Sequence, residues 1–164
     1  MPQNDVLQST EAARRLFETI SEDESRTKPD ENSWSALECL EHIVAVENAV
    51  LDILDKNLDV SSSDSVGVSK IQAVMSNRKK RFSAPENLLP EGRLATWQEA
   101  TQKFFDQRRR LVETIANRVH EQPGTFDHPA LGPMTKLDWI YFAIAHTERH
   151  LFQIKDVLAL NRTQ

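Results

Sequence analysis

The sequence predicts an all-α protein, and more specifically a four-helix bundle. Only 4 of its 164 residues are glycine, whereas an all-β chain needs turn signals roughly every eight to twelve residues. Prolines and other turn residues gather instead in a few short stretches, and the long segments between them carry apolar residues at helical spacing. We expect a single domain over residues 1–164, because a chain of this length suits one hydrophobic core.

The first helix is expected from Asp5 to about Glu24. Apolar residues recur along one side of this segment, namely Leu7, Ala13, Leu16, Phe17 and Ile20. Pro29 and the polar residues at 30–32 should end it, because proline and small polar side chains favour turns.

A second helix is expected to begin after Ser33 or Ser35 and to run to about Leu58. Ser35 and Glu38 have the spacing of a capping box, in which each side chain accepts a hydrogen bond from the other residue's backbone. A wide apolar arc covers one side of this helix, and polar residues occupy the remainder: Glu38, Glu41, Asn48, Asp52 and Lys56.

The middle of the chain is expected to form one long connection. The serine-rich residues 61–65 read as a loop, Val68 to Phe82 as a shorter helix, and 83–92 as a connection that contains proline. This short helix is additional to the four of the bundle.

Two more long helices complete the predicted bundle. One runs from Ala95 to Val119, and the last runs from Lys136 to about Leu160. Residues 122–133 lie between them, and their three prolines and two glycines indicate an irregular connection.

Charge and composition exclude several classes of partner. The chain has 20 Lys plus Arg against 25 Asp plus Glu, which gives a net charge of −5. Nucleic-acid binding needs a concentrated basic surface, and the two basic runs, at 78–81 and 108–110, are each embedded in helical patterning. There is no apolar stretch near the roughly 18 residues of a membrane span and no signal-peptide pattern. We therefore expect a cytoplasmic protein without a nucleic-acid or membrane partner.

Two histidines of the last helix lie within its apolar stripe. At 100° per residue, His146 and His150 fall among the apolar residues Trp139, Ala143, Ile154 and Val157. Histidines at positions i and i+4 have Cβ atoms roughly 5–6 Å apart, so two imidazole nitrogens can converge on one ion. The pair should point into the bundle.

The second helix offers a third inward histidine, because His42 lies at the edge of its apolar arc. Three imidazoles would give an ion three neutral nitrogen ligands and leave positions open for water or substrate. A structural alternative remains, in which hydrogen bonds satisfy these histidines in a metal-free core. Metalloprotease chemistry is disfavoured, because Thr147 stands where a zincin has its glutamate and Glu148 points away from the histidines.

Three segments of the chain resemble the DinB-like superfamily. WSALECLEHI at 34–43 is similar to that family's second helix, which follows a tryptophan and bears one histidine. HPALGPMT at 128–135, then Trp139 and HTERHLFQI at 146–154, resembles its loop and its HxxxHxxQI helix. The short segments 84–86 and 90–92 resemble the connection between its long helices.

The resemblance implies a bundle with up-down-down-up connectivity, often a homodimer, that holds a divalent metal ion such as zinc or nickel. The implied ligands are His42, His146 and His150. Family members with known activity include S-transferases that use bacillithiol, isomerases that use mycothiol and YfiT-like hydrolases. A small-molecule substrate is therefore the implied partner.

Three further residues have two interpretations each. His128 either approaches the metal pocket or caps its own loop, and we favour the cap. Arg108 lies near the apolar stripe of its helix and either enters the cleft, where it would hold an anionic substrate group, or extends to solvent. Cys39 is expected to be a buried, inert thiol rather than a nucleophile or a fourth ligand.

The predicted function is metal-dependent chemistry on a small molecule. The chain would either transfer a low-molecular-weight thiol to an electrophile or hydrolyse its substrate, and the absence of an evident general base weakens the hydrolase version more. The alternative is a non-catalytic bundle that binds a metal or ligand as a stress-related protein.

Overall fold

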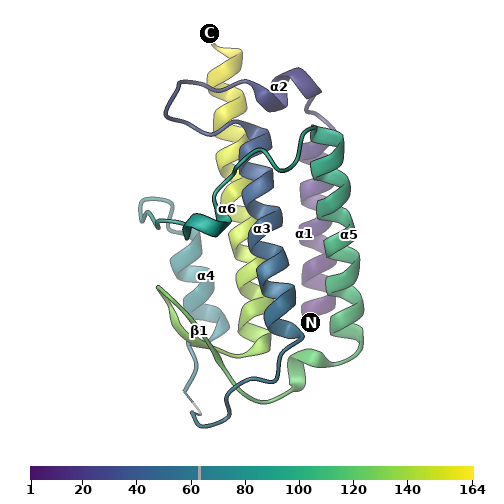
Figure 1. Cartoon of the computed structure of the whole chain (residues 1–164), viewed down its shortest axis with the longest axis vertical. Coiled ribbons are helices and arrows are strands. Elements are labelled where there is room, and N and C mark those ends of the chain that lie inside the picture. Colours follow the sequence, from purple (N-terminus) through teal and green to yellow (C-terminus); the bar gives the residue numbers. More distant parts are fainter. Residues whose placement is uncertain (63) are drawn as a thin grey trace.

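The computed structural model describes residues 1–62 and 64–164 and confirms the predicted helical bundle (Figure 1). The four long helices are α1 (Pro2–Phe17), α3 (Ala36–Leu54), α5 (Trp97–Ala116) and α6 (Lys136–Arg162). In Figure 1, α1 and α6 run upward and α3 and α5 run downward, which is the expected up-down-down-up connectivity. The two successive downward helices require a long connection that returns the chain to the top of the bundle.

Shorter elements fill the connections. These are α2 (Glu22–Arg26), α4 (Val68–Ser76), the 3-10 turns η1 (Glu86–Leu88) and η2 (Val119–Glu121), and the strands β1 (Phe126–His128) and β2 (Gly132–Met134). The strands form a small antiparallel hairpin in which Phe126 pairs with Met134, within a segment that we expected to be irregular. The hairpin is tied to α6, because the indole N–H of Trp139 donates to the carbonyl of Phe126.

The prediction of one helix from Asp5 to about Glu24 is wrong, because α1 ends at Phe17 and a separate helix, α2, follows it. The Ser21 hydroxyl accepts a hydrogen bond from the Glu24 amide and starts α2 as a separate helix. This break turns Glu22 toward the start of α5, where its carboxylate accepts the backbone N–H groups of Trp97 and Gln98. One carboxylate therefore caps a helix that begins 75 residues later.

The start of α3 is confirmed, and its end falls earlier than predicted. Ser35 and Glu38 form both hydrogen bonds of the capping box. The helix ends at Leu54, whose carbonyl accepts a 2.7 Å hydrogen bond from the buried ammonium group of Lys136. A cation at a helix C-terminus satisfies a carbonyl that has no partner within the helix.

The additional helix α4 is also shorter than predicted, since it ends at Ser76 rather than Phe82. The Arg149 guanidinium accounts for this, because it donates to the carbonyls of Met75, Asn77 and Lys80 at and beyond the last turn. The basic run at 78–81 therefore lies outside a helix, contrary to its helical patterning.

Two clusters of buried apolar side chains hold the bundle together. One joins α3, α4, α5 and α6, and the other joins α1, α3, α5 and α6 around Phe17, Leu40 and Phe104. No helix in the described residues combines the length and the apolar character that crossing a membrane would require.

Candidate metal centre

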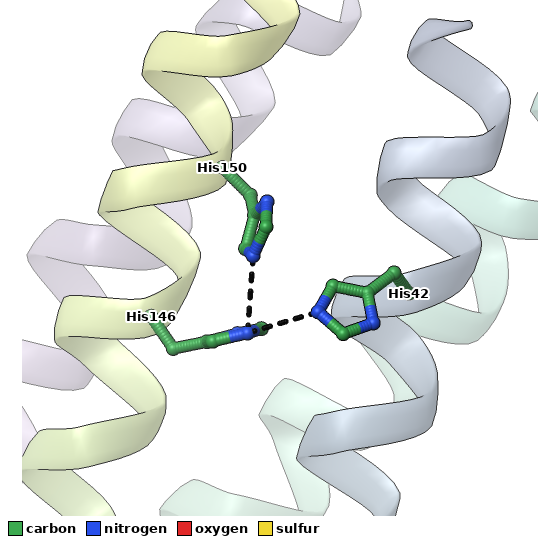
Figure 2. A group of neighbouring side chains, drawn as sticks. All are labelled: His42, His146 and His150. Carbon is green, nitrogen blue, oxygen red and sulfur yellow. Dashed lines mark hydrogen bonds between the residues drawn. The ribbon is translucent and has the colours of Figure 1, made fainter. Parts of the chain in front are cut away.

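Three imidazoles meet between α3 and α6. His42 comes from α3, and His146 and His150 lie one turn apart on α6 (Figure 2). The Nε2 atom of His146 is 3.2 Å from Nε2 of His42 and 3.1 Å from Nε2 of His150. His42 and His146 are buried and His150 is partly buried. One ligand nitrogen from each residue lies within 4.8 Å of the others, so the group has the compactness of a metal site.

Two of the rings are oriented by hydrogen bonds on the side facing away from the cluster. Nδ1 of His42 is 2.7 Å from the Leu88 carbonyl oxygen, and Nδ1 of His150 is 2.7 Å from Oε1 of Gln153. Both partner oxygens only accept, so each Nδ1 carries the proton and donates it. Each Nε2 is left with a lone pair that faces the cluster, the tautomer that a metal ligand requires.

The three imidazole nitrogens form a ligand set that suits a cation. A neutral His146 can offer at most one hydrogen from Nε2, so it can satisfy only one of its two close neighbours. The other neighbour then directs its Nε2 lone pair at that nitrogen with no hydrogen between the two atoms, and a cation held among the three nitrogens would relieve this contact. Burial lowers the pKa of all three histidines, that of His150 to about 4, which disfavours an extra proton in this role. Three neutral imidazoles are ligands that zinc and nickel accept.

The lowered pKa values predict how the metal-free protein responds to acid. The unfolded chain binds protons on these histidines near pH 6.5, whereas the folded chain resists them down to about pH 4 at His150. Stability is therefore complete above pH 6.5 and is lost as the pH falls from 6.5 toward 4, by about 1.4 kcal/mol per unit of pKa difference. Urea unfolding of metal-free protein across this range measures the slope. His150→Phe should flatten it, and an unchanged slope would contradict the assignment.

A buried carboxylate next to His42 anchors the neighbouring loop. Glu41 is 3% exposed, and its two oxygens accept the four consecutive backbone N–H groups of residues 91–94. We expected Glu41 outside the apolar arc of its helix; it is nevertheless buried, because the returning connection covers this position. The anchored loop follows directly after η1, which supplies the Leu88 carbonyl to His42.

We therefore expect Glu41→Gln to weaken metal binding without removing any ligand. An amide offers one acceptor oxygen and brings two N–H donors toward backbone N–H groups, so the loop at 91–94 loses its anchor. Loss of an outer partner of a ligating histidine lowers metal affinity roughly 10–100-fold. Zinc titration by calorimetry measures the change. Glu38→Gln, on the same helix, is the matched control, and equal affinity for both variants would remove the role given to Glu41.

The histidines form one wall of a cavity of about 840 Å³. Its lining comes from α3, α6, the connection at 81–89 and the hairpin loop, and it is mainly apolar. Trp34 covers the cluster from the side, with ring centroids 5.2 Å from His42 and 6.4 Å from His150. This volume lies within the usual range for small-molecule sites.

His128 lies in this cavity wall and also caps its loop, so both of its interpretations apply. Its Nδ1 accepts the backbone N–H groups of Ala130 and Leu131, each at 3.1 Å. The ring packs against Trp139 and Phe142, with centroids 5.6 and 4.9 Å away. Because Nδ1 accepts, the proton of the neutral ring is on Nε2. His128 can therefore donate a hydrogen bond but has no free lone pair to act as a base.

Arg108 neither enters the cavity nor extends to solvent, so both interpretations of this residue are wrong. It is 2% exposed, and its Nε lies 2.5 Å from Oε1 of Glu47, which is equally buried. Its two Nη atoms donate to Ser9 at 3.0 Å and to Thr147 at 2.8 Å. The guanidinium stays inside the bundle because the carboxylate that neutralises it is there.

Cys39 is confirmed as a buried thiol. It is fully buried, and burial raises its pKa to about 12. A thiol that stays protonated at neutral pH is neither a good nucleophile nor a metal ligand.

Sequence reasoning missed the residues that support the three histidines. Leu88 contributes a backbone carbonyl, for which a sequence carries no signal. Gln153 gave a usable signal, since it stands three residues after His150 and therefore on the same helix face. Glu41, which anchors the loop after Leu88, could not be recognised, because a buried glutamate is identified only by its partners.

Comparison with known proteins agrees with the fold. The DinB superfamily matches residues 6–154. The chain is 23% identical over 139 residues to the uncharacterized protein YuaE of Bacillus subtilis (strain 168), which covers 84% of this chain and 85% of that protein. It also resembles the crystal structure of TT2238, a four-helix bundle protein, with a TM-score of 0.58 and 19% identity over 94% of this chain and 98% of that one. The extent of the family match shows that this chain is a member of the DinB superfamily.

Proposed function

We propose that this protein is a metal-dependent enzyme that acts on a small molecule, with His42, His146 and His150 as the ligands of a divalent ion. The observation that carries the proposal is the arrangement of three neutral Nε2 atoms, two of them fixed by Nδ1 hydrogen bonds, at the wall of a substrate-sized cavity. Zinc or nickel held there supplies a nucleophile near neutral pH by lowering the pKa of a bound thiol or water.

The lining of the cavity favours thiol transfer over hydrolysis. Among the described lining residues, Asp156 is the only carboxylate, and it is paired with Arg78. His128 presents a donor rather than a lone pair. Hydrolysis of an ester or amide needs a group that moves protons between water and the leaving group. A thiol that loses its proton to solvent when it binds needs no such group. Transfer of a low-molecular-weight thiol to an electrophile therefore does not require a general base in this lining.

The residues of the chain have separable roles in this proposal. The three imidazoles bind the ion and hold it at the protein's interior. Trp34 limits the access of water to the two histidines that it covers. The apolar walls, among them Val50 and Leu131, hold the body of the acceptor against the site.

Cobalt-substituted protein tests the choice between the two reactions. Addition of bacillithiol, mycothiol or glutathione should produce a sulfur-to-metal charge-transfer band in the near-ultraviolet, and His42→Ala should abolish it. His128→Ala is the control that keeps all three ligands and should retain the band. If no thiol changes the spectrum while esters or amides are turned over, the hydrolase replaces the transferase. If neither occurs, the non-catalytic binding protein is the better description.

A further inference from the structure

Two arginines of the basic run at 78–81 line the cavity that contains the histidines. Arg78, Arg81 and Arg149 contribute to the lining, against a single carboxylate from Asp156. The whole chain carries a net charge of −5, whereas the charged side chains that line this cavity include more cations than anions. Positive charge around an opening in a low-dielectric wall attracts anions.

The three guanidinium groups differ in how much of their hydrogen-bonding capacity is already used. Arg149 donates to three carbonyls of α4 and the residues after it. Arg78 is paired with Asp156. Arg81 is exposed and has no hydrogen bond or ion pair with the rest of the described chain. Arg81 is therefore available to a ligand, and Arg78 becomes available when it leaves Asp156.

The remainder of the cavity lining has a different character. It consists of the three histidines and of aromatic and aliphatic side chains, among them Trp34, Val46, Val50, Leu88, Leu131, Trp139 and Phe142. A ligand that occupies this cavity can therefore contact both cations and apolar surface.

We propose that the cavity selects an amphipathic small molecule with an oxyanion head group, a carboxylate or a phosphate. Arg81 binds the head with help from Arg78, and the apolar body packs against the aromatic and aliphatic lining that the cavity shares with the three histidines. This inference deepens the proposed function, because it names the class of molecule brought to that site. Arg–oxyanion contacts are charge-assisted and can be bidentate, which gives them both strength and direction.

Metal-free protein tests this recognition without the ion, so that no oxyanion–metal contact can account for binding. The ligands are octanoate, octyl phosphate, neutral octanol and cationic octylammonium, at pH 7.5. Trp34 and Trp139 line the cavity and report binding through their fluorescence, and calorimetry gives the affinity. We expect at least one of the two anions to bind roughly tenfold more tightly than octanol, the effect of one favourable charge contact, and octylammonium to bind most weakly.

Variants assign the preference to particular side chains. Arg81→Ala should reduce the affinity for the anions to that for octanol and leave octanol binding unchanged, which also shows that the cavity is intact. Asp156→Asn should strengthen anion binding several-fold by releasing Arg78. Arg109→Ala is the control, since Arg109 is exposed and pairs with Asp106 away from the cavity.

Three results would overturn the proposal: octanol binding as tightly as both anions, octylammonium binding best, or Arg81→Ala leaving the anion preference intact. A carboxylate is the preferred head group if octanoate alone shows the advantage, and a phosphate if octyl phosphate alone does. If the anion preference is absent, the proposed metal site is unaffected and its substrate does not need a negative charge. Conversely, if no thiol changes the spectrum of the cobalt-substituted protein but the anions still bind, the cavity binds anions without thiol chemistry.

Discussion

Arg108→Met is expected to lower the free energy of unfolding by about 3–5 kcal/mol, the usual effect of leaving a buried charge without its partner. The substitution keeps an unbranched side chain in the space between α1, α3, α5 and α6, so the loss is electrostatic rather than a cavity. Glu47 would remain 2% exposed with no cation near it, and Thr147 would lose its 2.8 Å hydrogen bond. Urea denaturation at pH 7.5 measures the change.

The paired variant separates this explanation from a general packing defect. Replacing both residues, Arg108→Met with Glu47→Leu, removes the unpaired charge and should recover most of the lost stability. Burial raises the pKa of Glu47 and the Arg108 guanidinium opposes that rise, so the defect of Arg108→Met alone should shrink at lower pH as Glu47 takes up a proton. A double variant that is less stable than the single one would contradict this account.

His146→Ala should weaken zinc binding by more than the roughly 10–100-fold that loss of an outer partner causes. His146 is the central member of the cluster, since its Nε2 is the one in close contact with both other histidines. The fold should persist, because the apolar clusters of the bundle do not depend on this residue. Competition between the protein and a chromophoric chelator measures the dissociation constant, and circular dichroism checks the fold.

His128→Ala provides the matched control for this experiment. His128 lines the same cavity and is partly buried, but it is not part of the compact group of ligand nitrogens. Its removal should leave zinc affinity within a few-fold of the wild-type value. Equal losses in both variants would show that zinc binds elsewhere in the cavity.

The position of the histidine cluster was predictable because helical periodicity is a strong signal in long amphipathic segments. His146 and His150 lie in the apolar stripe of α6 and His42 at the edge of the arc of α3, and both assignments follow from 100° per residue. The capping box at Ser35 likewise follows from local spacing and needs no tertiary information.

Features that depend on contacts between distant segments were not predictable. The spacing of Arg108 on its own helix cannot distinguish solvent, a cleft or a buried partner, and Glu47 on α3 decides the outcome. The ends of α3 and α4 are set by Lys136 and Arg149, which reach them from α6. The hairpin at 126–134 arises in a proline-rich stretch where composition indicates only a turn.

The zinc K-edge X-ray absorption spectrum of zinc-loaded, untagged protein tests the central claim most directly. The account predicts about one ion per chain, with imidazole scattering from three histidines at about 2.0–2.1 Å and no sulfur shell near 2.3 Å before any thiol is added. His146→Ala should lower the histidine contribution together with the zinc content. A sulfur or all-oxygen first shell, or zinc that stays well below one ion per chain after reconstitution, would contradict the assignment of His42, His146 and His150 as its ligands.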